Sequence, residues 1–296
     1  MMKAFVGVAR GPFLLLSITL VAAGAGAAAY EDGFSWSRTL LALVGLVALH
    51  AAVNTLNEVS DMRRGIDLHT RRTPFSGGSG TLPSGALSWQ GALVFGLAAA
   101  AVGLVIGLIL LADIGWPLVP FLVIGGVSVL AYSDVFARLG LGELFAGLGL
   151  GLLPVAGTAL VQDGRLGAAG LAAGVPAFLM TFNLLFLNEF PDEEADRAGG
   201  RRNLVLLLGR PRAAALYSLL GLLVPVWLVS AWLLGWLPAI ALIALIPSLM
   251  LVPPLRWAFG RPDDEVPIPA LASNVVWNLA TNVVLAIAFV IAIWTR

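Results

Sequence analysis

The chain has 296 residues, of which 59% are hydrophobic and only 11% are Asp, Glu, Lys or Arg. Soluble globular domains carry about 25% charged residues, so this composition excludes a water-soluble domain. The formal net charge of zero argues against nucleic-acid binding, which requires a basic surface. Because the sequence has no cysteine, disulfides, thiolate metal sites and cysteine nucleophiles are excluded.

Apolar stretches long enough to cross a bilayer recur along the whole chain. A transmembrane helix needs roughly 20 mostly apolar residues. We expect nine such spans, over residues 11–30, 38–57, 90–112, 116–133, 142–162, 167–188, 213–234, 236–253 and 273–294. The first stretch also has features of a secretory signal, but eight further spans favour a retained helix. The sequence therefore predicts an all-α polytopic membrane protein, with residues 1–296 forming one transmembrane domain around a central cavity.

The basic residues give the orientation, since Lys and Arg gather on the cytoplasmic side of a membrane. With the N-terminus inside, only Arg38, Arg165 and Arg296 fall outside. The cytoplasmic segments hold the other 14 of 17, which are Lys3, Arg10, Arg63, Arg64, Arg71, Arg72, Arg138, Arg197, Arg201, Arg202, Arg210, Arg212, Arg256 and Arg261. We therefore expect a multi-pass protein of the cell (inner) membrane, with a cytoplasmic N-terminus and its polar chemistry on the cytoplasmic side.

Polar side chains follow the second span at helical spacing. Asn57 and Asp61 are four residues apart and share a helix face, as does Asn54 one turn earlier. Asp67 lies six residues beyond Asp61 and would point elsewhere on a continuous helix. Gly65 offers a helix end that lets Asp67 turn back toward the others.

A second acidic cluster follows the sixth span. Asn188, Asp192 and Asp196 recur every four residues, which predicts a single stripe on a helix that continues past the membrane boundary. Carboxylate and amide oxygens suit Mg²⁺, which is usually held by one or two carboxylates plus substrate phosphates. Two such clusters interleaved with arginines indicate a site for a magnesium-bound diphosphate. The alternative is that both are charge-balanced, solvated loops.

These motifs and their positions resemble the UbiA superfamily of intramembrane prenyltransferases, which have nine transmembrane helices and two aspartate-rich motifs after helices two and six. Asn57-x-x-x-Asp61 with Gly65-Ile-Asp67 is similar to the first motif, and Asp192-x-x-x-Asp196-Arg197 with Gly200-Arg201-Arg202 to the second. The stretches 77–85 and 140–144 resemble the branch containing 1,4-dihydroxy-2-naphthoate prenyltransferases. The segment from Tyr132 to Arg138 departs from that branch, which has a proline- and lysine-containing stretch there.

The resemblance implies Mg²⁺-dependent transfer of a polyprenyl group from an allylic diphosphate to an aromatic acceptor, 1,4-dihydroxy-2-naphthoate, within membrane lipid. The catalytic carboxylates would be Asp61, Asp67, Asp192 and Asp196. The metal ligands would be these four with Asn57 and Asn188. Substrate would be bound by Asn54, Arg72, Tyr132, Arg138, Arg201 and Arg202. Other acceptors stay open: 4-hydroxybenzoate, a glyceryl phosphate lipid or a porphyrin.

A transporter is the alternative from a different class, because carriers also combine repeated halves with carboxylates at the membrane edge. It predicts ionisable residues near the middle of the spans, where this sequence has almost none apart from His50. We expect His50 to be a buried polar contact rather than a ligand, and His69 to be a solvated loop residue.

Overall fold

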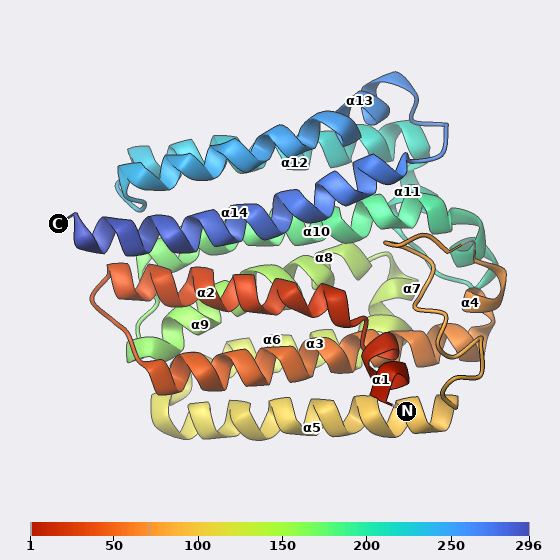
Figure 1. The fold of residues 1–296 in the computed structure, drawn as a ribbon, viewed down its shortest axis with the longest axis horizontal. Coiled ribbons are helices and arrows are strands. Elements are labelled where there is room, and N and C mark those ends of the chain that lie inside the picture. Colours follow the sequence, from red (N-terminus) through yellow and green to blue (C-terminus); the bar gives the residue numbers. More distant parts are fainter. Residues whose placement is uncertain (1, 71, 296) are drawn as a thin grey trace.

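The computed structural model describes residues 2–70 and 72–295, and every regular element in this part of the chain is helical. Eight helical segments in it are long and apolar enough to cross a membrane. They are η1 and α2 (Gly11–Leu14, Leu15–Tyr30), α3 (Trp36–Arg64), α5 (Trp89–Ile114), α8 with η4 and α9 (Gly142–Gly147, Leu148–Leu152, Leu153–Asp163), α10 (Ala168–Ala198), α12 (Arg210–Leu233), η5 with α13 (Ala239–Leu251, Val252–Gly260) and α14 (Ile268–Trp294). Figure 1 shows them lying side by side along one axis.

A ninth span is present if a bent helix pair is counted as one. Trp116–Leu130, which comprises η2 (Trp116–Leu118) and α6 (Val119–Leu130), meets Tyr132–Leu139 at an angle of 64°. The second arm consists of a π-helical turn, η3 (Tyr132–Phe136), and α7 (Ala137–Leu139). The predicted all-α membrane architecture is confirmed, and π-helical turns of this kind often mark functional positions.

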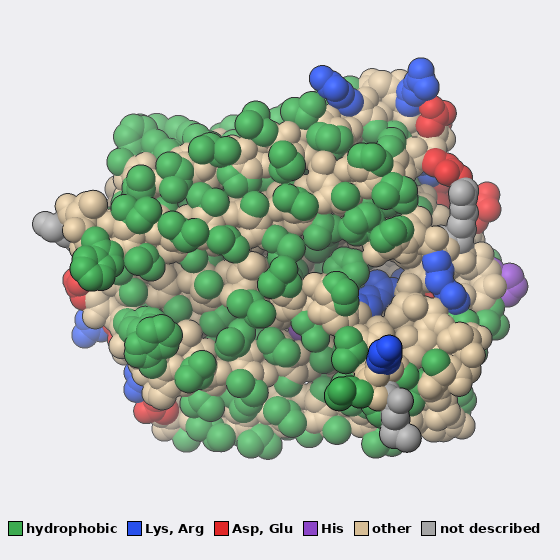
Figure 2. All heavy atoms as spheres, viewed as in Figure 1, with side chains coloured by type: hydrophobic (Ala, Val, Ile, Leu, Met, Phe, Trp, Pro, Cys, Tyr) green, Lys and Arg blue, Asp and Glu red, His purple; other side chains and the backbone are tan. Residues whose placement is uncertain are grey.

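The surface of the bundle is apolar around its middle. Figure 2 shows hydrophobic side chains covering the central part of this face, with charged side chains gathered toward the two ends. Large side chains such as Leu104, Val226 and Val94 are more than half exposed. Such a surface suits lipid, where helices satisfy their own backbone hydrogen bonds. The protein is an integral multi-pass membrane protein.

Two helices extend well beyond their predicted spans. Residues 38–57 were expected to cross the membrane, and α3 runs to Arg64; residues 167–188 were expected, and α10 runs to Ala198. Apolar character ends where a span leaves the bilayer, but a helix satisfies its own backbone and continues into polar sequence. Both acidic motifs therefore lie largely on rigid helix ends rather than in loops.

Helix α10 occupies the centre of the bundle, in contact with α2, α8, α9, α12 and α14. The main core cluster combines large side chains such as Trp277 and Phe289 with alanines on α2 and α10. Small residues let membrane helices approach closely, which is how such helices pack without a hydrophobic driving force. The position of α10 fixes the second acidic motif against the rest of the bundle.

Candidate active site

The first motif is organised by the end of α3. Asn57 Nδ2 donates to Asp61 Oδ2 over 2.9 Å, and Ser133 Oγ of η3 donates to Asn57 Oδ1 over 3.1 Å. Gly65 ends α3 in the left-handed conformation with φ 75°, which glycine adopts without strain. The chain then turns into α4 (Ile66–His69), and Asp67 is buried there. Gly65 is the helix end expected from the sequence.

The second motif is a stripe on α10. Asn188, Asp192 and Asp196 all line the same cavity. The helix is continuous through Pro191. Asp196 is almost fully buried, and its Oδ2 accepts a hydrogen bond of 2.9 Å from Asn203 Nδ2.

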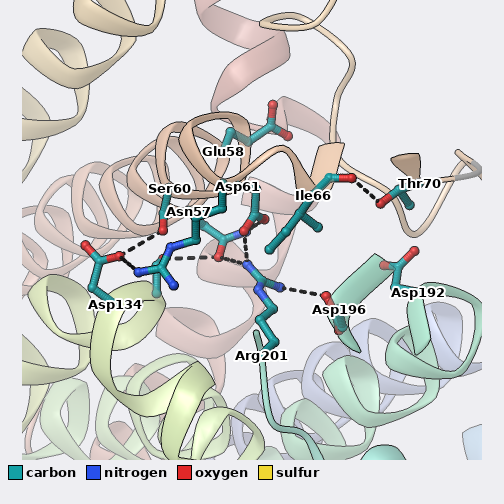
Figure 3. Close-up of polar contacts among 12 residues, drawn as sticks. Asn57, Glu58, Ser60, Asp61, Ile66, Thr70, Asp134, Asp192, Asp196 and Arg201 are labelled. Atoms are coloured by element: carbon teal, nitrogen blue, oxygen red, sulfur yellow. Dashed lines mark hydrogen bonds and ion pairs between the residues drawn. The ribbon is translucent and has the colours of Figure 1, made fainter. Parts of the chain in front are cut away.

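Arg201 joins the two motifs, as Figure 3 shows. Its Nη2 donates to Asn57 Oδ1 over 2.8 Å and forms a short ion pair with Asp61, while Nη1 lies 3.6 Å from Asp196 Oδ1. The loop that carries Arg201 is fixed by its own backbone, because Arg201 N donates to Asp196 O over 2.9 Å. The guanidinium is thus held between carboxylates from both halves of the chain.

The segment between α4 and α5 crosses the same end of the bundle. Gly77 N donates to Asp192 Oδ2 over 3.2 Å, and Ser79 Oγ donates to Glu58 Oε2 over 2.6 Å. Gly78 has φ +74°, and a Cβ there would stand 2.8 Å from Asp67 Oδ1. This segment therefore contacts both motifs, and only glycine fits against Asp67.

The site is electrostatically acidic. Burial, reinforced by the charges of Asp61 and Glu58, raises the pKa of Asp67 to about 7. Burial alone would lower the pKa of Arg201, but the carboxylates of Asp61 and Asp196 raise it above its usual value. The two arginines of the cavity wall, Arg201 and Arg10, do not balance its carboxylates, which favours binding of a further cation.

The described residues offer oxygen ligands for a hard cation such as Mg²⁺, but too few of them at one point to hold the ion without other ligands. Asp67 Oδ2 and Asp192 Oδ1 are buried and have no hydrogen-bond partner among the described residues, so both can act as ligands. Among the described residues, however, no group of three or more His, Asp or Glu side chains is placed to hold a metal ion by itself. Substrate phosphates and water would therefore have to complete the coordination of a Mg²⁺ ion here.

Both motifs open onto a cavity of about 200 Å³. Its polar end contains the acidic residues and Arg201, and apolar side chains such as Leu46 and Leu150 line the cavity farther from the two motifs. Leu46 lies 15 residues before Asp61 on α3, which corresponds to about 22 Å along a helix. The cavity can therefore hold a charged head group together with an apolar tail.

The structure brings most of the predicted site residues together. The cavity is lined by Asn54, Asn57, Asp61, Asp67, Tyr132, Asn188, Asp192, Asp196 and Arg201. Three predicted arginines do not line it: Arg72, Arg138 and Arg202 have exposed side chains. Phosphate-binding arginines cannot be chosen by proximity in sequence, because the direction of each side chain depends on the local turn.

The two histidines differ in position. His50 is buried and its Nδ1 lies 2.9 Å from Ser17 Oγ, so it is the polar contact expected, although it also lines the cavity. His69 is exposed, and its Nδ1 is 2.8 Å from Gly65 O.

Three cavity-associated residues were missed by sequence reasoning. Arg10 lines the cavity, and its Nε donates to Glu58 Oε1 over 3.1 Å. Glu58 has no exposed side-chain surface, and Glu189 is buried in the cavity wall. Their positions in the sequence could have indicated them. Arg10 directly precedes the first span, and each glutamate directly follows the asparagine of its motif.

Comparison with known proteins shows the family to which this chain belongs. The model of the UbiA prenyltransferase family matches residues 15–279, so the chain belongs to that family and is a membrane prenyltransferase. A 1,4-dihydroxy-2-naphthoate octaprenyltransferase of Mycobacterium tuberculosis is 31% identical over 297 residues, covering 94% of this chain and 95% of the relative. A digeranylgeranylglyceryl phosphate synthase of Natronomonas pharaonis is 29% identical, covering 84% of this chain and 83% of the relative.

A solved structure supports the fold independently. The UbiA homologue from Archaeoglobus fulgidus, described as bound to GPP and Mg²⁺, superposes with a TM-score of 0.69 at 17% identity. The match covers 97% of this chain and 99% of that one. The helical arrangement is thus shared almost from end to end.

Proposed function

We propose that this protein transfers a polyprenyl group from an allylic polyprenyl diphosphate to 1,4-dihydroxy-2-naphthoate, the prenylation step of menaquinone synthesis, with Mg²⁺ as the cofactor. The observation that carries the proposal is the single cavity with both acidic motifs and Arg201 at one end and apolar side chains at the other. A diphosphate and an isoprenoid tail match these two ends. The name of the Mycobacterium tuberculosis relative supports the choice of acceptor.

Magnesium would be held by oxygen ligands from both motifs: Asn57, Asp61, Asp67, Asn188, Asp192 and Asp196. The unpartnered oxygens Asp67 Oδ2 and Asp192 Oδ1 support this assignment, as does the Mg²⁺ named with the homologue from Archaeoglobus fulgidus. When bound, the metal neutralises negative charge that develops on the departing diphosphate.

Arginines would bind the same diphosphate. Arg201 is held rigidly by Asn57 and Asp61, so its charge is aimed before the substrate arrives. Arg10 uses its Nε for Glu58, which leaves the other guanidinium nitrogens for a ligand in the cavity. Contacts from Arg72, Arg138 and Arg202 stay a prediction.

As the allylic carbon–oxygen bond breaks, the apolar cavity wall keeps water from the carbocation. Aromatic faces near the polar end would stabilise this cation, and Tyr132 and Phe145 both line the cavity. An electron-rich carbon of the acceptor ring then forms the new carbon–carbon bond. The ring regains aromaticity by losing a proton or carbon dioxide from that carbon.

A second acceptor class has one specific observation in its favour. The Natronomonas pharaonis relative is named for synthesis of a glyceryl phosphate lipid. For either acceptor we propose the cell (inner) membrane as the location, with the N-terminus and the site on the cytoplasmic side. The concentration of basic residues on that side supports this orientation.

Purified protein supplied with Mg²⁺, a labelled polyprenyl diphosphate and a panel of acceptors tests the proposal. The panel contains 1,4-dihydroxy-2-naphthoate, 4-hydroxybenzoate, a glyceryl phosphate lipid and a porphyrin. We expect a labelled prenylated naphthoate, with release of one diphosphate per product. A prenylated lipid instead would select the second acceptor class, and no product with any acceptor would contradict the proposed reaction.

A further inference from the structure

Helix α10 presents two further side chains to the cavity, within and at the edge of the acidic stripe. Leu185 and Glu189 are four residues apart, share a face and both line the cavity. Glu189 is rotated from Asn188 by about 100° around the helix axis. It lies only about 60° from Asp192 and about 20° from Asp196, so its side chain stands at the edge of the diphosphate stripe, beside Glu143 of α8, which packs on α10.

The part of the cavity wall that α8 provides is aromatic. Phe145 of α8 lines the cavity, and its ring stacks on Phe136 with the centroids 3.5 Å apart and the planes 2° from parallel. Stacking on Phe136 limits the rotation of Phe145, so the wall is preformed. A flat, rigid wall near the polar end suits an aromatic ring better than a flexible chain.

Glu189 is a buried carboxyl that lies beside another carboxyl. The residue is 8% exposed, and its Oε2 is buried with no hydrogen-bond partner among the described residues. The group within hydrogen-bonding reach of Glu189 is another carboxyl, that of Glu143 on α8. Glu143 is itself fixed, because its Oε1 accepts a hydrogen bond of 2.6 Å from Leu204 N.

Leaving a buried polar group unsatisfied is unfavourable, so a donor from the ligand would be selected at this position. The donor substrate offers only phosphate oxygens and hydrocarbon, whereas a phenolic acceptor offers O–H groups. A carboxyl group keeps lone pairs for this contact whether it is ionised or protonated. We infer that Glu189 lies in the acceptor subsite and accepts a hydrogen bond from a ring hydroxyl of the aromatic acceptor, while Phe145 packs against the ring.

This inference rests on the proposed function, and one set of kinetic measurements separates the two. Glu189→Leu removes the acceptor oxygens, and Glu189→Gln keeps one of them. Glu194 is exposed on the same helix, so Glu194→Leu is the matched control. For each protein we would measure KM for dihydroxynaphthoate, KM for the polyprenyl diphosphate, and Mg²⁺-dependent binding of the diphosphate alone.

We expect Glu189→Leu to raise KM for the acceptor about tenfold or more, as for loss of a hydrogen bond to a carboxylate. KM for the diphosphate and its binding should change less than about twofold. Glu189→Gln should have a smaller effect, and Glu194→Leu none.

The two monomethyl ethers of the acceptor locate the hydroxyl. In the unmodified protein one ether should bind more weakly than the dihydroxy parent, and in Glu189→Leu that difference should disappear. The inference would be overturned by any of three results. The first is an unchanged KM for the acceptor in Glu189→Leu, and the second is that the two ethers bind equally well in both proteins. The third is loss of diphosphate binding in both Glu189 variants. Absence of turnover by the unmodified protein with every aromatic acceptor would instead contradict the proposed function.

Discussion

Arg201 forms an ion pair with Asp61 although the two residues are 140 positions apart in the sequence. Asp61 belongs to the first motif and lies on α3, whereas Arg201 belongs to the second motif and follows the end of α10. The same guanidinium lies 3.6 Å from Asp196, so it contacts carboxylates of both motifs. Its geometry couples the two halves of the site before any substrate binds.

Replacement of Arg201 should therefore be costly. We expect Arg201→Ala to lower kcat/KM by about 100-fold or more, because a preorganised charge at the leaving group is lost. The kcat/KM of Arg201→Lys should lie between those of the unmodified protein and Arg201→Ala, since lysine keeps the charge but cannot bind bidentately. Steady-state kinetics with labelled diphosphate would measure both. Arg212→Ala, which changes an exposed arginine outside the cavity, is the control; an equal loss there would contradict a specific role for Arg201.

The carboxylates should control metal binding. Asp61→Ala and Asp192→Ala should abolish turnover while the protein stays folded in the membrane, because each removes a proposed Mg²⁺ ligand. A thermal shift on adding Mg²⁺ and diphosphate should be large in the unmodified protein and small in both variants. Chelation of Mg²⁺ should remove activity reversibly. Activity retained in both variants would discredit the metal assignment.

Gly78 provides a test of the segment that crosses the site. Gly78→Ala adds a Cβ 2.8 Å from Asp67 Oδ1 and places alanine at φ +74°. Gly85 has φ +72° with nothing within 4 Å of an added Cβ, so Gly85→Ala carries the backbone strain alone. Each variant should lose about 1–2 kcal/mol of stability. Only Gly78→Ala should also weaken Mg²⁺ binding, and equal Mg²⁺ affinities would show that the contact with Asp67 is unimportant.

Arg10 can be separated from its ion pair with Glu58. Arg10→Met should weaken diphosphate binding and also leave the buried Glu58 without its cation. Adding Glu58→Gln removes the unpaired charge. If Arg10 binds diphosphate, calorimetry should show that the double variant recovers stability but not diphosphate affinity. Recovery of both would limit Arg10 to a structural role.

The apolar end of the cavity should set the length of prenyl chain that is accepted. Leu46→Trp fills the far end and should reduce kcat/KM for a long donor about tenfold or more, because the tail is then overpacked. A short donor such as geranyl diphosphate should be unaffected. Val44→Trp, two residues away and exposed on the outer surface, is the control. Equal effects on short and long donors would place the tail elsewhere.

Much of the fold and part of the site were predictable because the bilayer imposes simple rules. Apolar length specifies the spans, and four-residue spacing puts Asn188, Asp192 and Asp196 on one stripe. Gly65 predicted the turn that returns Asp67 to the cavity, and its left-handed φ of 75° forms that turn. The predicted spans stop short of the ends of α3 and α10, because hydropathy reports the edge of the membrane rather than the end of the helix.

The sequence by itself determined the class of protein, the spans and the two carboxylate motifs, since each depends on local composition or spacing. Only the tertiary structure decided which arginines serve the site. Arg201 lines the cavity and Arg202, its neighbour, is exposed. It also placed Arg10 and Glu189 in the cavity wall. The physical reason is that a charge acts through distances of a few ångströms. Those distances depend on how α3, η1 and α10 are arranged in the bundle, and the order of residues along the chain does not show this arrangement.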